Sequence, residues 1–173
     1  MSLNETPWKK RREIPDSQVR DVAEQFDDAW RLLHSQPLES GLLLPILNNA
    51  AVALELYMKC LCAVVLHTPV DDFPGLAIVT AKASVKNHEL VGLLDSIPEY
   101  VRKPLEDSYT LTHPEESLRD KLSRYEGMFA ISRYAFEKND KNVSQYPLMP
   151  LMNLCTFLRE FTENMKPIEK IEC

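Results

Sequence analysis

The stretch GLLLPILNNAAVALELYMKCLCAVVL, residues 41–66, decides the fold class. When it is wound as a helix, apolar side chains cover nearly all of its circumference, which is the pattern of a helix at the centre of a bundle. We therefore predict a helix over about Glu39–Leu66. Pro45 should kink its first turns or delay its start, because proline has no backbone N–H to donate.

The same stretch is long enough to span a bilayer, but its polar residues argue against a membrane span. It carries Asn48, Asn49, Glu55 and Lys59. A lysine at the centre of a membrane helix costs about 3 kcal/mol, whereas each leucine returns only about 0.5 kcal/mol. Burial inside the protein is cheaper, so we expect no membrane span.

Apolar residues at helical spacing predict three further long helices. One begins at Asp16 or Ser17 and ends near Gln36. Its acidic residues fall mostly on the side away from the apolar stripe: Asp21, Glu24, Asp27 and Asp28. Another begins at the capping-box pattern Thr112–Glu115 and continues to Phe136, and the last covers about Pro147–Met165.

Shorter helices are predicted over Asn87–Ser96 and Glu99–Thr110, the second bent by Pro104. Residues 67–86 are predicted to be a long connection, and no alternating pattern predicts a strand. The predicted fold is an all-α, up-down bundle of four long helices plus one or two short ones. It forms a single domain over residues 16–166, between a flexible basic arm (1–15) and a C-terminal tail (167–173).

Composition limits the classes of function. An apolar fraction of 45% excludes a disordered chain. The 20 Lys and Arg against 26 Asp and Glu give a net charge of -6, which argues against a protein that simply coats nucleic acid. The basic run Lys9–Arg12, next to Trp8, is either a solvated tail or a local phosphate contact.

The cysteines and histidines do not have the spacing of a metal site. Cys60 and Cys62 point in different directions on a helix, and no Cys-x-x-Cys occurs. We expect no metal and no cofactor. The thiols are expected to be reduced, and the N-terminus lacks the apolar segment of a secretory signal, so we expect a cytoplasmic protein.

Two charged residues stand at apolar positions. Arg133 follows the apolar stripe one turn after Phe129, and Glu55 lies in the most apolar segment, one turn from Lys59. Because an unpaired buried charge costs several kcal/mol, we predict an Arg133–Glu55 contact. Glu137 is a competing partner of Arg133 on the same helix. The pair is either a structural ion pair or part of a polar cleft in which Arg133 binds a phosphate or ribose.

Three segments resemble motifs of the HEPN superfamily. Asn49–Lys59 resembles its second-helix signature, in which a Glu and a Lys lie one turn apart in an apolar helix. Lys86–Leu94 resembles the following His-acidic-Leu segment, and Phe129–Glu137 resembles an Arg-Tyr-x-x-Glu segment. The resemblance covers about Glu39–Glu137 and implies a helical bundle that forms a homodimer with a cleft between protomers.

The resemblance also implies a role in toxin–antitoxin or defence systems, with RNA, a nucleotide, an antitoxin or another protein as partner. Active members are metal-independent RNases that use an Arg followed four to six residues later by a His. No arginine of this chain has a His at that distance, and Arg31 with His34 comes nearest. Non-catalytic members are therefore the better analogy.

Three hypotheses follow for function. The first is a dimeric nucleotide- or RNA-associated binding or assembly module. Its cleft is predicted to contain Glu55, Lys59, Arg133, Tyr134 and Glu137. The second is an RNase with a displaced site built from Arg133 and His88, although His88 also suits a helix cap. The third is an adaptor that uses the Met-rich face of the last helix.

Overall fold

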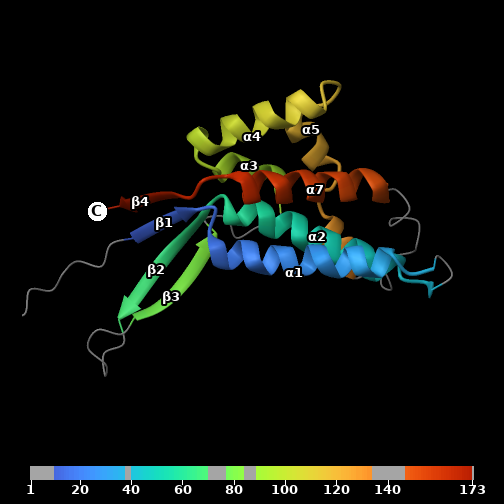
Figure 1. Cartoon of the computed structure of the whole chain (residues 1–173), viewed down its shortest axis with the longest axis horizontal. Coiled ribbons are helices and arrows are strands. Elements are labelled where there is room, and N and C mark those ends of the chain that lie inside the picture. The colour runs from blue at the N-terminus through green and yellow to red at the C-terminus, as the bar shows by residue number, and fades with distance from the viewer. Residues whose placement is uncertain (1–9, 38–39, 70–76, 84–88, 134–146, 173) are drawn as a thin grey trace, which may run out of the picture.

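The computed structural model describes residues 10–37, 40–69, 77–83, 89–133 and 147–172. They form a bundle of helices with a four-stranded sheet at one end (Figure 1). The helices are α1 (Ser17–His34), α2 (Leu43–Cys60), α3 (Leu90–Ser96), α4 (Glu99–Thr112), α5 (Leu118–Ser123), α6 (Met128–Arg133) and α7 (Leu148–Asn164). The strands are β1 (Lys10–Ile14), β2 (Ala63–Pro69), β3 (Ala77–Ala83) and β4 (Ile168–Glu172).

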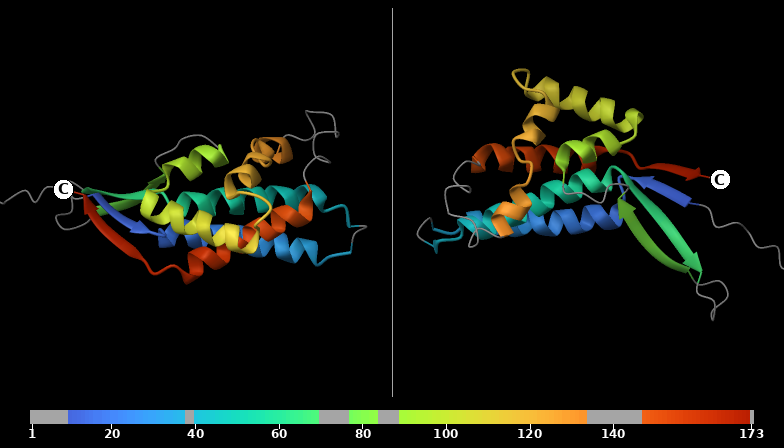
Figure 2. Two further views of the ribbon diagram at one scale, coloured as in Figure 1. Left: turned by 90° about the horizontal axis from the view of Figure 1, so that it is seen from above. Right: turned by 180° about the vertical axis from the view of Figure 1, so that it is seen from behind.

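Helix α2 is the central helix of the bundle, as its apolar circumference predicts. It packs against α1, α3, α6 and α7, and Figures 1 and 2 show α1 and α7 running along it. Leu54, Tyr57 and Met58 are fully buried. The predicted helical bundle is confirmed, but its fourth long helix is α4, which was predicted to be short, and three helices among the described residues are short: α3, α5 and α6. No helix in the described ranges has the length and apolar character needed to cross a bilayer.

Several predicted helix ends are confirmed by their capping groups. The carboxylate of Asp16 accepts a hydrogen bond from the backbone N–H of Val19 at 2.9 Å and caps α1. Pro147 occupies the N-cap position of α7, and Pro45 falls in the first turn of α2, where no backbone N–H is needed. The start of α2 is therefore delayed to Leu43 rather than kinked.

The sheet was not predicted. Its order is β3-β2-β1-β4 with every neighbouring pair antiparallel, and β2 and β3 extend away from the bundle (Figure 1). Residues 61–66 were predicted to prolong the central helix, but the helix ends at Cys60, whose carbonyl accepts from the Asp16 N–H at 2.8 Å. A short apolar run has the same pattern whether it is a buried strand or a helix end, which explains the error.

The two chain ends also differ from the prediction. Lys10–Ile14, assigned to a flexible arm, is β1, and Ile168–Glu172, assigned to a tail, is β4. The two strands pair with each other, with Lys10 opposite Glu172 and Ile14 opposite Ile168. Neither segment alternates clearly between apolar and polar residues. Each forms a strand by pairing with the other end of the chain, and a local sequence pattern does not reveal such a partner. The remaining residues of the predicted arm, 1–9, lie outside the described residues.

The predicted long helix from residue 112 to Phe136 is wrong. Helix α4 continues to Thr112, so the predicted capping box is a helix end, and Ser117 instead caps α5 by accepting from the Asp120 N–H at 3.0 Å. Gly127 then separates α5 from α6 with a φ of 71°. This left-handed conformation favours glycine and interrupts the helical run.

Candidate functional site

The acidic residue predicted at the centre of the bundle is buried and paired within its own helix. Glu55 lies on α2 with only 6% of its surface exposed. The Lys59 ammonium, one turn further along α2, donates to Glu55 Oε1. The pair is therefore held in an apolar helix, where an ion without a partner would cost several kcal/mol.

Helix α6 meets α2 at a polar contact. The Ser132 hydroxyl donates to Asn48 Oδ1 at 3.4 Å, and Ser132 is buried. Asn48 lies two turns before Glu55 on α2. We call Asn48, Glu55, Lys59 and Ser132 the α2–α6 seam. The first three recur at helical spacing along one face of α2, and Glu55 and Lys59 are the two that were predicted as site residues.

The other predicted site residues are not described in the same detail. Arg133 is the last residue of α6, but its side chain lies outside the described part of the structure. Tyr134, Glu137 and His88 lie outside the described residues altogether. The predicted Arg133–Glu55 contact therefore stays a prediction, as does a contact between Arg133 and Glu137.

A buried charge cluster between α1 and α7 was missed. Asp27, predicted on the outer side of α1, is fully buried. It accepts from Trp30 Nε1 at 2.7 Å, Arg31 Nε at 2.8 Å and Arg159 Nη1 at 2.8 Å. The sequence carried a signal, because Asp27 lies one turn after Ala23 and one turn before Trp30 on the apolar stripe.

The cluster links α1 to α7 through arginines. Arg159 on α7 also donates to Asp28 at 2.6 Å and to Glu163 at 2.9 Å, and these hydrogen bonds raise the pKa of its guanidinium. Arg31 donates to the Thr156 hydroxyl at 2.8 Å. The charges are matched by opposite charges and hydrogen bonds, so the cluster is suited to fixing the two helices rather than to reacting with a substrate.

A tyrosine stands beside this cluster. The Tyr57 hydroxyl on α2 is buried and has no hydrogen-bond partner among the described residues. Burial raises the pKa of this hydroxyl, and the negative charge of Asp27 raises it further. Tyr57 is therefore neutral at physiological pH and is unsuited to act as a base.

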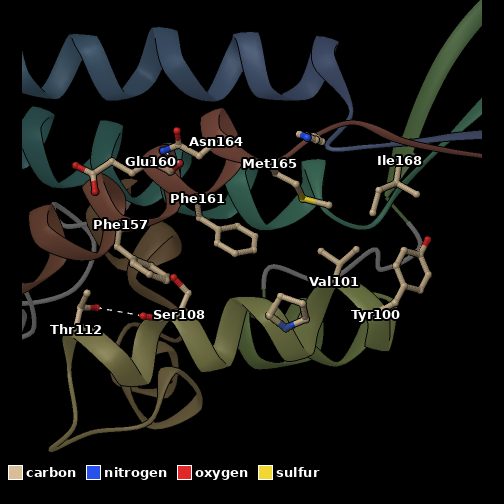
Figure 3. Close-up of a pocket in the computed structure, with 12 residues that line it drawn as sticks. Tyr100, Val101, Ser108, Thr112, Phe157, Glu160, Phe161, Asn164, Met165 and Ile168 are labelled. Carbon is tan, nitrogen blue, oxygen red and sulfur yellow. Dashed lines mark hydrogen bonds between the residues drawn. The ribbon is translucent and has the colours of Figure 1, made fainter.

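A pocket lies elsewhere, between α4 and α7 (Figure 3). Its volume is about 570 Å³, within the range of about 300–1,000 Å³ found for small-molecule sites. Most of its wall is apolar: Tyr100, Val101, Pro104, Phe157, Phe161 and Met165. Its polar groups come from both helices and the segment after α7: Ser108, Thr112, Glu160, Asn164 and Lys166.

A smaller hollow of about 250 Å³ continues the pocket along α7. It shares Thr112, Phe157 and Glu160 with the α4–α7 pocket, and His113 is among the residues that line only the smaller hollow. The His113 ring stacks on Tyr109, with ring centroids 4.4 Å apart, and its Nδ1 lies 2.8 Å from the Thr112 hydroxyl. The sequence did not predict this pocket, since it is formed by two helices far apart in the chain.

Among the residues that the structure describes, the remaining titratable groups form neither a metal site nor a reactive thiol. Within the described ranges, no three His, Cys, Asp or Glu side chains are arranged to hold a metal ion. Cys60, Cys62 and Cys155 are buried. Burial raises the pKa of the Cys60 and Cys155 thiols, so both stay protonated and weakly reactive.

Comparison with models of protein families, with curated proteins and with solved structures found no match to this chain. Function must therefore be inferred from the residues themselves. The α2–α6 seam and the α4–α7 pocket share no residue, so they are considered as separate sites.

Proposed function

We propose that this chain is a HEPN-like helical domain that acts as a dimeric binding or assembly module associated with RNA or a nucleotide. The proposed site is the α2–α6 seam together with Arg133, Tyr134 and Glu137. The observation that carries the proposal is the Glu55–Lys59 ion pair in the apolar central helix α2, which packs against α6, the helix that ends at Arg133. A toxin–antitoxin or defence role, with an antitoxin or other protein partner, belongs to the same proposal.

Charge supports this site in physical terms. Lys59 keeps about a fifth of its side chain exposed, at 22%, while its ammonium is held by Glu55. A phosphate at the seam would gain from the Lys59 ammonium and from the Arg133 guanidinium, whose planar fork of N–H groups can donate to two phosphate oxygens at once. Asn48 and Ser132 add neutral hydrogen-bonding groups of the kind that bind a ribose or a base edge.

The test is RNA binding over a salt series, with Arg133→Met compared with Arg102→Met. Arg102 is a matched control because it lies on α4, away from the seam, and pairs with Asp95. Loss of one phosphate contact to single-stranded RNA lowers the slope of log affinity against log salt by about 0.7. We expect that change for Arg133→Met and none for Arg102→Met, with similar melting temperatures.

Light scattering supplies the second measurement. A dimer has about twice the chain mass of 19.9 kDa. A monomer, or salt slopes that are equal for both variants, contradicts the proposal. A severe loss of stability in Arg133→Met with unchanged binding assigns Arg133 a structural role instead. If the protein fragments RNA and His88→Ala abolishes that activity, the result favours an RNase built from Arg133 and His88 over a binding module.

A further inference from the structure

We propose that the pocket between α4 and α7 binds an organic cation, meaning a protonated amine attached to an aromatic or extended apolar body. The pocket shares no residue with the α2–α6 seam, so this inference does not depend on the proposed function. Three features carry it: the aromatic wall, a carboxylate beside that wall, and the volume of the pocket.

The aromatic wall is a connected set of rings. Phe157 meets the Tyr109 ring edge-on at 5.1 Å, and Tyr109 stacks on His113 at 4.4 Å. Phe161, one turn after Phe157 on α7, lies 6.3 Å from it. Both phenylalanines line the pocket (Figure 3). The face of an aromatic ring is negative, so such a wall attracts both apolar groups and cations.

The carboxylate is Glu160, which lies between Phe157 and Phe161 on α7 and lines both hollows. Its carboxylate makes no ion pair with any residue that the structure describes, whereas the nearby Glu163 is held by Arg159. A negative charge beside aromatic rings selects a cation over a neutral or anionic molecule of the same shape.

The hydroxyls at the same part of the pocket suit an ammonium group. The Thr112 hydroxyl contacts the Tyr109 carbonyl at 3.1 Å and His113 Nδ1 at 2.8 Å; when it donates to the carbonyl and accepts from Nδ1–H, one oxygen lone pair is left to accept from a ligand N–H. Ser108 lies one turn away on α4. The positive Lys166 lies beyond the end of α7, so the pocket has a negative part at Glu160 and a positive part near its other end.

The volume sets the size of the ligand body. A pocket of about 570 Å³ accommodates a fused two-ring system with a short amine arm. Val101 and Pro104 line the pocket from α4, and Phe157 and Phe161 line it from α7, so a flat apolar body is contacted by both helices. An aromatic amine of this size fits the three features together.

The test uses three probes with one naphthalene body and different charges: 1-naphthylmethylammonium, neutral 1-naphthalenemethanol and the anion 1-naphthylacetate. Binding to the full chain is measured by titration, with amide chemical shifts to locate it. We expect shifts along α4 and α7, and tighter binding of the cation than of the other two. Glu160→Gln should weaken binding of the cation about fivefold and leave binding of the neutral probe unchanged, since Glu160 is exposed and an exposed charge contact contributes modestly.

Asp107→Asn is the matched control, because Asp107 is an exposed α4 residue that does not line the pocket. It should leave all three affinities unchanged. Ser108→Phe fills the pocket and should abolish binding of every probe. Equal affinities for the three probes, equal effects of Glu160→Gln and Asp107→Asn, or shifts confined to other helices would each overturn the inference. Because Glu160→Gln removes no buried group, the test remains valid even if Ser108→Phe unfolds.

Discussion

Replacing Asp27 with alanine should be one of the most damaging single changes in this chain. The substitution leaves three donors without their acceptor: Trp30 Nε1, Arg31 Nε and Arg159 Nη1. Breaking a buried ion pair by removing one partner costs about 3–5 kcal/mol. Arg31 and Arg159 keep 38% and 25% of their side chains exposed and partly rehydrate, so we expect the lower end, about 3 kcal/mol.

Asp28→Ala is the matched control. Asp28 follows Asp27 directly and also accepts from Arg159, but 65% of its side chain is exposed. An exposed ion pair contributes about 0.2–1 kcal/mol, so this variant should lose less than about 1 kcal/mol. The comparison therefore separates the effect of burial from the effect of losing an acidic residue on the same helix turn.

Urea unfolding followed by circular dichroism at 222 nm measures both variants. The midpoint should fall strongly for Asp27→Ala with an unchanged slope, which indicates a change in stability rather than in the unfolding transition. The melting temperature should fall by roughly 6–12 °C for a chain of this size. Asp27→Asn keeps the side-chain volume but turns an acceptor into a donor, so it should lose at least half as much.

The reasoning fails if Asp27→Ala loses less than about 1 kcal/mol, or no more than Asp28→Ala. It also fails if Asp27→Asn is as stable as the wild type, because the charge of the carboxylate would then contribute nothing. Either result would mean that Arg31 and Arg159 are solvated well enough without Asp27, and that the link between α1 and α7 does not depend on the buried carboxylate.

Three further predictions use local features. Gly127→Ala should cost about 1 kcal/mol in urea unfolding, because its φ of 71° is left-handed, whereas Gly92→Ala in α3 should be neutral or stabilising by up to about 1 kcal/mol. The hydrogen bond from Arg119 lowers the pKa of Asp95, so Arg119→Met should raise that pKa in an NMR titration. The small stabilisation of the folded state by this pair exists above about pH 4, and it is lost as the pH falls through the pKa of Asp95 in the folded protein. Cys155 should resist thiol reagents at pH 8 until the protein unfolds, as site-resolved mass spectrometry would show.

Local patterns in the sequence predicted the helices that have clear ends. The cap at Asp16 and the proline before α7 act within a few residues, so the positions of α1 and α7 follow from neighbouring side chains. The extent of α2 was overestimated because residues 61–66 are apolar throughout, and such a run does not distinguish helix from strand.

Features that depend on distant parts of the chain were missed. Strands β1 and β4 come from opposite ends of the sequence, and neither has a pattern that identifies its partner. The α4–α7 pocket requires Phe157 on α7 to face Ser108 on α4, and these residues are far apart in the sequence. Asp27 is an intermediate case: its position on the apolar stripe was available, but its burial becomes plausible only once Arg159 on α7 is known to reach it.

The three sides of α7 explain how the buried cluster and the pocket depend on one helix. Leu151, Cys155 and Leu158 form its buried side, whereas Arg159 on a second side is tied to Asp27 on α1. The third side presents Phe157, Glu160 and Phe161 to the pocket. Since β4 pairs with β1 just beyond the end of α7, the helix is held along its length and after its end. A helix fixed in this way holds its pocket residues in place before a ligand arrives, which lowers the entropic cost of binding.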